Sequence, residues 1–186
     1  MALAPAPQNP PPIADQRTLP NDQLAEQSTL GGMMLSQEAV AEVFDEVRAA
    51  DFYAPKHEII FNAILDLYSK GEPTDVIAVS DELTKTGLIQ RAGGLDYLHT
   101  LTSIVPTAAN ANYYASIVSE RATLRRLIEA GTRIAQMGYS NEGEVEELVN
   151  QAQSEIYKVA GDRLSDEVVG LNTSLEAALN EIEAAS

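Results

Sequence analysis

One stretch of the chain constrains the fold more than any other. Residues 113–137 contain no proline and only one glycine, Gly131. At about 25 residues, this stretch is roughly twice the length of an average globular helix, and its apolar residues recur at helical spacing. The segment 138–141 (GYSN) predicts a tight turn, and Asn141 with Glu144 resembles a capping box that starts a second helix ending near residue 160. Two helices joined by a short loop form an antiparallel hairpin.

The residues before this stretch predict several shorter helices. Asp22 and Ser36 can cap the first two, and Pro55 suits the first turn of a third, which Gly71 is placed to end. Residues 74–79 include a β-prone run, VIAV, but the run is short and helical signals flank it. We therefore expect a helix there rather than a strand.

Two glycine pairs, Gly31-Gly32 and Gly93-Gly94, are interpreted as helix punctuation, and the first pair should weaken the second half of its helix. The core must be aliphatic, because 45% of the residues are hydrophobic, only 5% are aromatic and none is tryptophan. Such a core favours helix-on-helix packing. The predicted fold class is all-α: a small helical bundle, then a long antiparallel helical hairpin and the start of a linker helix.

The predicted division of the chain has five parts. A Pro-rich, disordered tail covers residues 1–18, a globular helical domain 19–108, the hairpin 109–160 and an acidic connector 161–172. Thr173 and Glu176 form a capping box for a helix over residues 173–186. The tail lacks the features of a signal peptide, no apolar run is long enough for a membrane span, and there is no cysteine. We expect a cytoplasmic protein with no membrane contact.

The charge of the chain is strongly negative. It has 12 basic and 28 acidic residues, a formal net charge of −16. Non-specific DNA binding depends on lysine and arginine neutralising phosphates, so little direct DNA binding is expected. The charge would steer a partner with a basic face towards the chain, and a simple role in solubility explains it equally well.

The sequence carries no recognisable catalytic motif. It has no Gly-x-x-x-x-Gly-Lys-Ser/Thr phosphate loop, no Gly-x-Gly-x-x-Gly, no Gly-x-Ser-x-Gly and no His-Glu-x-x-His. His57 falls in the first turn of a predicted helix, where surface packing is expected, and His99 lies between Leu98 and Leu101, where a partly buried imidazole is expected. No catalytic, cofactor-binding or metal-binding residue is predicted.

The hairpin is the best candidate for a functional surface. Two helices bury only the faces that they turn to each other, so apolar surface remains for another chain to cover. The alternative is that the hairpin folds back on residues 19–105 as a monomer; we favour oligomerisation, without separating the two faces of the hairpin. The candidate interface residues are Ile117, Leu124, Leu127, Ile128, Ile134, Leu148, Val149 and Ile156.

Four stretches together resemble the N-terminal domain of replicative DNA helicases of the DnaB family. They are residues 19–35 (LPNDQLAEQSTLGGMML), 51–60 (DFYAPKHEII), 93–101 (GGLDYLHTL) and 110–127 (NANYYASIVSERATLRRL). The last, an Asn followed by Tyr-Ala-x-Ile-Val and an Arg-rich helix, is the most specific. The resemblance covers about residues 19–160. The acidic connector and the predicted helix from Thr173 onwards are similar to the linker helix of the family.

The resemblance implies a homohexameric ring that couples ATP hydrolysis to 5′-to-3′ unwinding at the replication fork. ATP and Mg²⁺ would belong to a RecA-like motor beyond residue 186, so this stretch itself is not expected to be an enzyme. Paired hairpins would build a trimer-of-dimers collar that recruits primase, with a helicase loader as a further candidate partner. The linker helix would dock on the neighbouring motor through Leu175, Leu179 and Ile182.

A second hypothesis is an unrelated, all-helical adaptor or regulator that dimerises through the hairpin. Composition and periodicity alone support it as well as they support a helicase collar.

Overall fold

The computed structural model describes residues 18–140 and 143–159 of the chain. Every regular element within these two ranges is a helix: α1 (Gln23–Leu35), α2 (Gln37–Glu46), η1 (Ala49–Asp51), α3 (Pro55–Ser69), α4 (Val76–Lys85), α5 (Gly94–Ser103), η2 (Ala108–Asn110) and α6 (Ala111–Ser140). Residues 145–159 form a further helix. The all-α prediction is confirmed. No helix in this part of the chain is long and apolar enough to cross a membrane.

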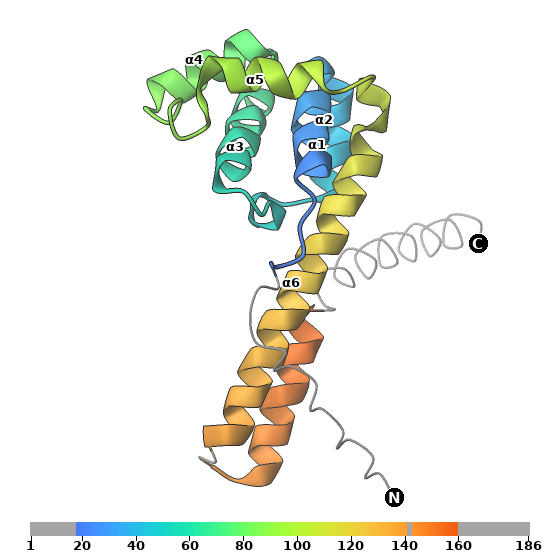
Figure 1. Cartoon of the computed structure of the whole chain (residues 1–186), viewed down its shortest axis with the longest axis vertical. Coiled ribbons are helices and arrows are strands. Elements are labelled where there is room, and N and C mark those ends of the chain that lie inside the picture. Colours follow the sequence, from blue (N-terminus) through green and yellow to red (C-terminus); the bar gives the residue numbers. More distant parts are fainter. Residues whose placement is uncertain (1–17, 141–142, 160–186) are drawn as a thin grey trace, which may run out of the picture.

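The molecule has a globular region and a projecting hairpin (Figure 1). Helices α1 to α5 form the globular region, and α6 runs out of it as one continuous rod. Residues 145–159 lie antiparallel to the second half of α6. The predicted turn at residues 138–141 is misplaced, because residues 138–140 belong to α6 and the left-handed backbone lies at Gly143 (φ 104°). The proposed Asn141 cap falls outside the described residues, as do Leu175, Leu179 and Ile182.

Several helix ends follow from local chemistry. The carboxylate of Asp22 accepts from the backbone N–H of Ala25, and the hydroxyl of Ser36 accepts from Ala39 N–H, so both predicted N-caps are confirmed. Pro55 occupies the first turn of α3. Residues 76–85 are helical, as predicted, because the Asp75 carboxylate caps the N–H groups of Ile77 and Ala78.

Helix α1 forms the centre of the globular core. Its Leu30 and Met33 side chains are fully buried and belong to one apolar cluster with residues of α2 to α6. The interpretation of Gly31-Gly32 as punctuation is wrong, since both glycines lie inside α1 and are buried. A Cβ on Gly31 would lie 2.1 Å from the carbonyl oxygen of Leu101 in α5, and one on Gly32 would lie 2.6 Å from the Ala111 Cβ. The pair therefore allows α1 to pack closely against its neighbours.

The other glycine pair does punctuate the chain. Gly93 and Gly94 have φ values of 100° and 79°, and Gly93 is the N-cap of α5. This left-handed backbone is accessible to glycine at little cost. The pair therefore sets the direction in which α5 leaves the preceding turn.

Candidate assembly surface

The first half of α6 is part of the globular core. Ala111, Ala115, Val118 and Ala122 are buried at helical spacing. We call residues 111–126 the root of the hairpin. Two arginines fix the end of the root: Arg125 donates to the carbonyl oxygens of Pro20 (2.8 Å) and Asp51 (2.5 Å), and Arg126 forms an ion pair of 2.6 Å with the Asp51 carboxylate.

The second half of α6 packs on residues 145–159. The least exposed apolar positions are Ala130, Ile134 and Met137 on α6 and Leu148, Ala152 and Val159 on the second helix, where Glu155 is also buried. A cross-hairpin ion pair joins Arg133 Nε to Glu155 Oε2 at 2.6 Å, and Lys158 Nζ lies 2.6 Å from the other oxygen of Glu155. The hydrogen bonds from Lys158 and Arg133 lower the pKa of Glu155. These contacts set the register of the two helices.

The remaining large apolar side chains of the hairpin are exposed. Six of them are between 41% and 73% exposed: Leu124, Leu127, Ile128, Val145, Val149 and Ile156. We call these six the hairpin stripe. On each helix the stripe follows helical spacing, since Leu124 and Ile128, like Val145 and Val149, are four residues apart.

The two halves of the hairpin stripe lie on one side of the hairpin. On α6, the buried face carries Ala130, Ile134 and Met137, and the stripe lies beside this face, further round the helix in the sense in which the chain winds. On the second helix, the stripe lies beside the face with Leu148, Ala152 and Val159, displaced in the same sense. Because the helices are antiparallel (Figure 1), the same rotational sense brings both displacements to the same side. A contiguous, exposed apolar surface of this kind is typical of an interaction site.

The structure divides the predicted interface residues into three groups. Leu124, Leu127, Ile128, Val149 and Ile156 are exposed and belong to the hairpin stripe. Ile134 and Leu148 are half-buried between the two hairpin helices. Ile117 packs against the globular core. Val145 was not among the predicted interface residues, although it lies four residues before Val149 and could have been found from this helical spacing.

The expectations for both histidines are wrong. His57 is 1% exposed, whereas His99 is exposed. His57 Nδ1 lies 2.5 Å from Glu26 Oε2, and His57 Nε2 lies 2.6 Å from the Tyr97 hydroxyl. Glu26 is also 1% exposed and accepts from the backbone N–H groups of Tyr53 (2.7 Å) and Ala54 (3.3 Å). A position on the apolar face of α1, four residues before Leu30, was the available signal that Glu26 is buried.

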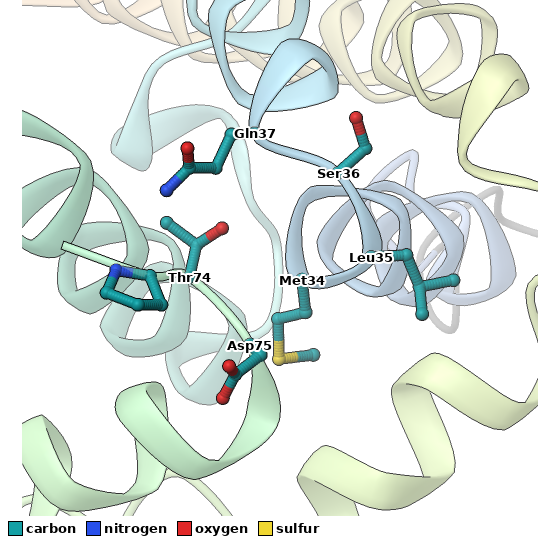
Figure 2. A pocket seen from close by; sticks show the side chains of 7 residues that line it. Met34, Leu35, Ser36, Gln37, Thr74 and Asp75 are labelled. Atoms are coloured by element: carbon teal, nitrogen blue, oxygen red, sulfur yellow. The ribbon is translucent and has the colours of Figure 1, made fainter. Parts of the chain in front are cut away.

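A shallow hollow lies where the end of α1 meets the starts of α2 and α4 (Figure 2). It is lined by Met34, Leu35, Ser36, Gln37, Pro73, Thr74 and Asp75. Its polar side chains bond to the protein itself: Thr74 Oγ1 donates to the Met33 carbonyl (3.2 Å), Gln37 Nε2 donates to the Glu72 carbonyl (3.0 Å) and Asp75 caps α4. The hollow is therefore a joint between helices rather than a site for a ligand. Among the described residues, no group of three or more His, Cys, Asp or Glu side chains could hold a metal ion.

Comparison with known protein families shows to which family the chain belongs. The model for the DnaB-like helicase N-terminal domain matches residues 18–120, more than half of the 186 residues. The chain belongs to the family of DnaB-like helicase N-terminal domains. The resemblance expected from the four sequence stretches is confirmed.

The replicative DNA helicases that the chain is similar to are much longer than this chain. It is 64% identical over 169 residues to the replicative DNA helicase DnaB of Leifsonia xyli subsp. xyli (strain CTCB07). This alignment covers 91% of the chain but 37% of that protein. The chain thus spans little more than a third of the length of this relative.

Solved structures of DnaB-like proteins share the fold. The N-terminal domain of DnaB helicase from Mycobacterium tuberculosis is similar with a TM-score of 0.72 and 56% identity, over 76% of this chain and 99% of that domain. A DnaB-like replicative helicase, described together with its interactions with primase, is similar with a TM-score of 0.62 and 21% identity, over 83% of this chain and 35% of that one. The second likeness supports the fold alone.

Proposed function

We propose that this domain assembles the subunits of a replicative DNA helicase and recruits primase to them. Hairpins pair through the hairpin stripe, and the dimers join into the collar of a hexameric ring. The observation that carries this proposal is the stripe itself, six apolar side chains on one side of a projecting hairpin. Membership of the DnaB-like family supports the helicase context, in which the protein acts on cytoplasmic DNA.

Pairing by a twofold axis suits the shape of this surface. In a twofold interface the same patch faces its own copy, and the hairpin stripe would then be covered by a second hairpin stripe. The interface would exclude water from side chains that remain half-exposed in one chain. Burial of apolar area contributes about 25 cal/mol per Å², so the six side chains supply the main attraction.

ATP and Mg²⁺ belong, in this proposal, to a motor domain that the family relationship implies. The chain has no phosphate loop, so no step of nucleotide hydrolysis is assigned to its residues. Its contribution to unwinding is to hold motors together. Primase is the proposed partner because a related helicase is described with its interactions with primase, and a helicase loader is a second candidate.

Light scattering of the purified chain over a concentration series tests the assembly proposal. We expect a dimer or a larger oligomer, and Ile128→Asp should weaken association about 100-fold or more. An unpaired charge buried in an interface costs several kcal/mol, and each 1.4 kcal/mol is about tenfold in the dissociation constant. Ile128 is 44% exposed in the single chain, so the variant should still fold.

Matched controls place the same charge away from the hairpin stripe. Gln136→Asp on α6 and Asn150→Asp on the second helix change exposed residues and should leave association unchanged, whereas Val149→Asp should weaken it as Ile128→Asp does. A folded Ile128→Asp variant with the wild-type oligomer would reject the stripe as the interface. Primase recruitment is tested separately by calorimetry with the cognate primase, and a lack of heat at high concentration and low salt would reject that part.

A further inference from the structure

The segment 51–54, which joins η1 to α3, is held from two sides. On one side α1 contributes Glu26, whose carboxylate accepts from the N–H groups of Tyr53 and Ala54. On the other side α6 contributes Arg125, which donates to the Asp51 carbonyl, and Arg126, which is paired with the Asp51 carboxylate. The Arg125 guanidinium also lies 5.6 Å from the centre of the Tyr53 ring. The segment is thus the bridge between a buried polar cluster and the root of the hairpin.

The polar cluster extends from Glu26 to the surface at Tyr97. The Tyr97 hydroxyl accepts from Gln27 Nε2 at 3.0 Å and contacts His57 Nε2 at 2.6 Å. The Lys56 ammonium lies 3.6 Å from the centre of the Tyr97 ring. Tyr97 is half-buried, while Glu26 and His57 are almost completely buried. Tyr97 can therefore be reached from outside, whereas Glu26 and His57 cannot.

The hydrogen bonds of this cluster depend on one another. His57 Nδ1–H donates to the Glu26 carboxylate, and the Tyr97 hydroxyl is the hydrogen-bond partner of His57 Nε2. In this arrangement the Glu26 carboxylate has three donors around it, namely His57, Tyr53 N–H and Ala54 N–H. Loss of the Tyr97 hydroxyl leaves a buried imidazole nitrogen without its hydrogen-bond partner, and an unpaired buried polar group is energetically costly. We expect His57 and Glu26 to shift in response, together with the backbone of residues 53 and 54, whose N–H groups donate to Glu26.

We propose that segment 51–54 couples the Tyr97 surface to the root of the hairpin. A change at the Tyr97 hydroxyl alters the position of Glu26 and of the backbone of residues 53 and 54. The groups of Asp51 to which Arg125 and Arg126 bond then move as well. The proposal goes beyond the proposed function, because the coupling operates within one chain and depends neither on hairpin pairing nor on primase.

A double-mutant cycle measures this coupling directly. Tyr97→Phe removes only the hydroxyl, and Arg125→Lys retains the charge but loses the two-pronged donation to Pro20 and Asp51. Residues without a shared network change the unfolding equilibrium constant independently, to within about a factor of two. We expect the double variant to be at least threefold less destabilised than the product of the two single effects, because the second change acts on a bridge already released by the first.

A control cycle combines Tyr97→Phe with Arg133→Lys. Arg133 lies in α6, like Arg125, but it bonds to Glu155, outside segment 51–54. This pair should be independent. Hydrogen exchange gives a second readout: Tyr97→Phe should speed exchange at the amides of Tyr53 and Ala54, whereas Tyr68→Phe, at the other end of α3, should not. Independent effects of Tyr97→Phe and Arg125→Lys, or unchanged exchange at both amides, would overturn the proposal.

Discussion

The globular region and the hairpin use similar residues in opposite ways. In the globular region Leu30, Met33 and Ile60 have no exposed surface, and even charged groups such as Glu26 are enclosed and bonded. In the hairpin each helix buries one narrow line, and Leu124, Ile128 and Val149 remain largely exposed. The first region thus completes its core within one chain, whereas the hairpin leaves apolar surface uncovered, which is the surface that the proposed pairing would bury.

The largest expected effect is the loss of stability from a methyl group added at a glycine of the globular region. Gly31→Ala places a methyl group 2.1 Å from the Leu101 carbonyl oxygen, and overpacking costs about 1–3 kcal/mol, occasionally more. We expect a loss near the top of that range, about 3 kcal/mol, measured by urea unfolding. A loss below about 0.5 kcal/mol would mean that α1 and α5 separate easily, and the globular region would then be looser than its packing indicates.

The second contrast concerns two glutamates. Glu26→Gln should destabilise the chain by about 2 kcal/mol, because an amide cannot accept from three buried donors and leaves one of them unpaired. Glu155 is also buried, but its partners Arg133 and Lys158 are both exposed. Glu155→Gln therefore weakens ion pairs that solvent reaches from the basic side, and such pairs contribute about 0–1 kcal/mol. Thermal unfolding of both variants under one condition makes the comparison. Equal losses would show that the exposure of the partner groups does not separate the two sites.

A glycine in the hairpin should respond in the opposite direction. Gly131 lies within α6 with nothing within 4 Å of an added Cβ. Alanine in a helix interior is more stable than glycine by about 0.5–1 kcal/mol, so Gly131→Ala should stabilise the chain by this amount in urea unfolding. A destabilisation would indicate that a close contact forms at Gly131 when hairpins pair, which would extend the hairpin stripe.

The smallest expected effect is a dependence of the hairpin on acid. Lys158 and Arg133 lower the pKa of Glu155 below its ordinary value of 4.5. A carboxylate with a lowered folded-state pKa stabilises the fold fully above the unfolded value, and this contribution is lost as the pH falls through the folded value. Hydrogen exchange of residues 145–159 should therefore accelerate below about pH 4.5 by more in the wild type than in Glu155→Gln. Identical acid profiles would remove Glu155 from the forces that hold the register.

Local chemistry made much of the fold predictable. Asp22, Ser36 and Pro55 mark helix starts through bonds within a few residues, and the long proline-free stretch announced α6. The turn after α6 was placed three residues too early because Gly138 tolerates a helix as well as a turn. The glycine pair at 31–32 was misjudged because a glycine needed for close approach has the same local sequence as one that ends a helix.

Side-chain partners distant in sequence were not predictable. His57 lies 31 residues from Glu26 and 40 from Tyr97, and nothing near His57 shows that these three residues meet. The same holds for Arg125, which reaches Pro20 and Asp51. The hairpin stripe was partly predictable, since five of its six residues follow from periodicity, but which apolar residues the second helix covers depends on the register that Arg133 and Glu155 set.

Continuity of α6 has a consequence for how such domains can vary. Ala122 faces the core and Leu124 faces outwards on a single unbroken helix, and each residue turns a helix by about 100° and advances it by about 1.5 Å. The direction in which the hairpin stripe points therefore depends on the number of helical residues between the core and the stripe. One inserted residue between Arg126 and Arg133 would swing the tip by more than a quarter turn, so lengthening by about seven or eleven residues, close to two or three whole turns, is the geometry that would keep neighbouring subunits facing each other.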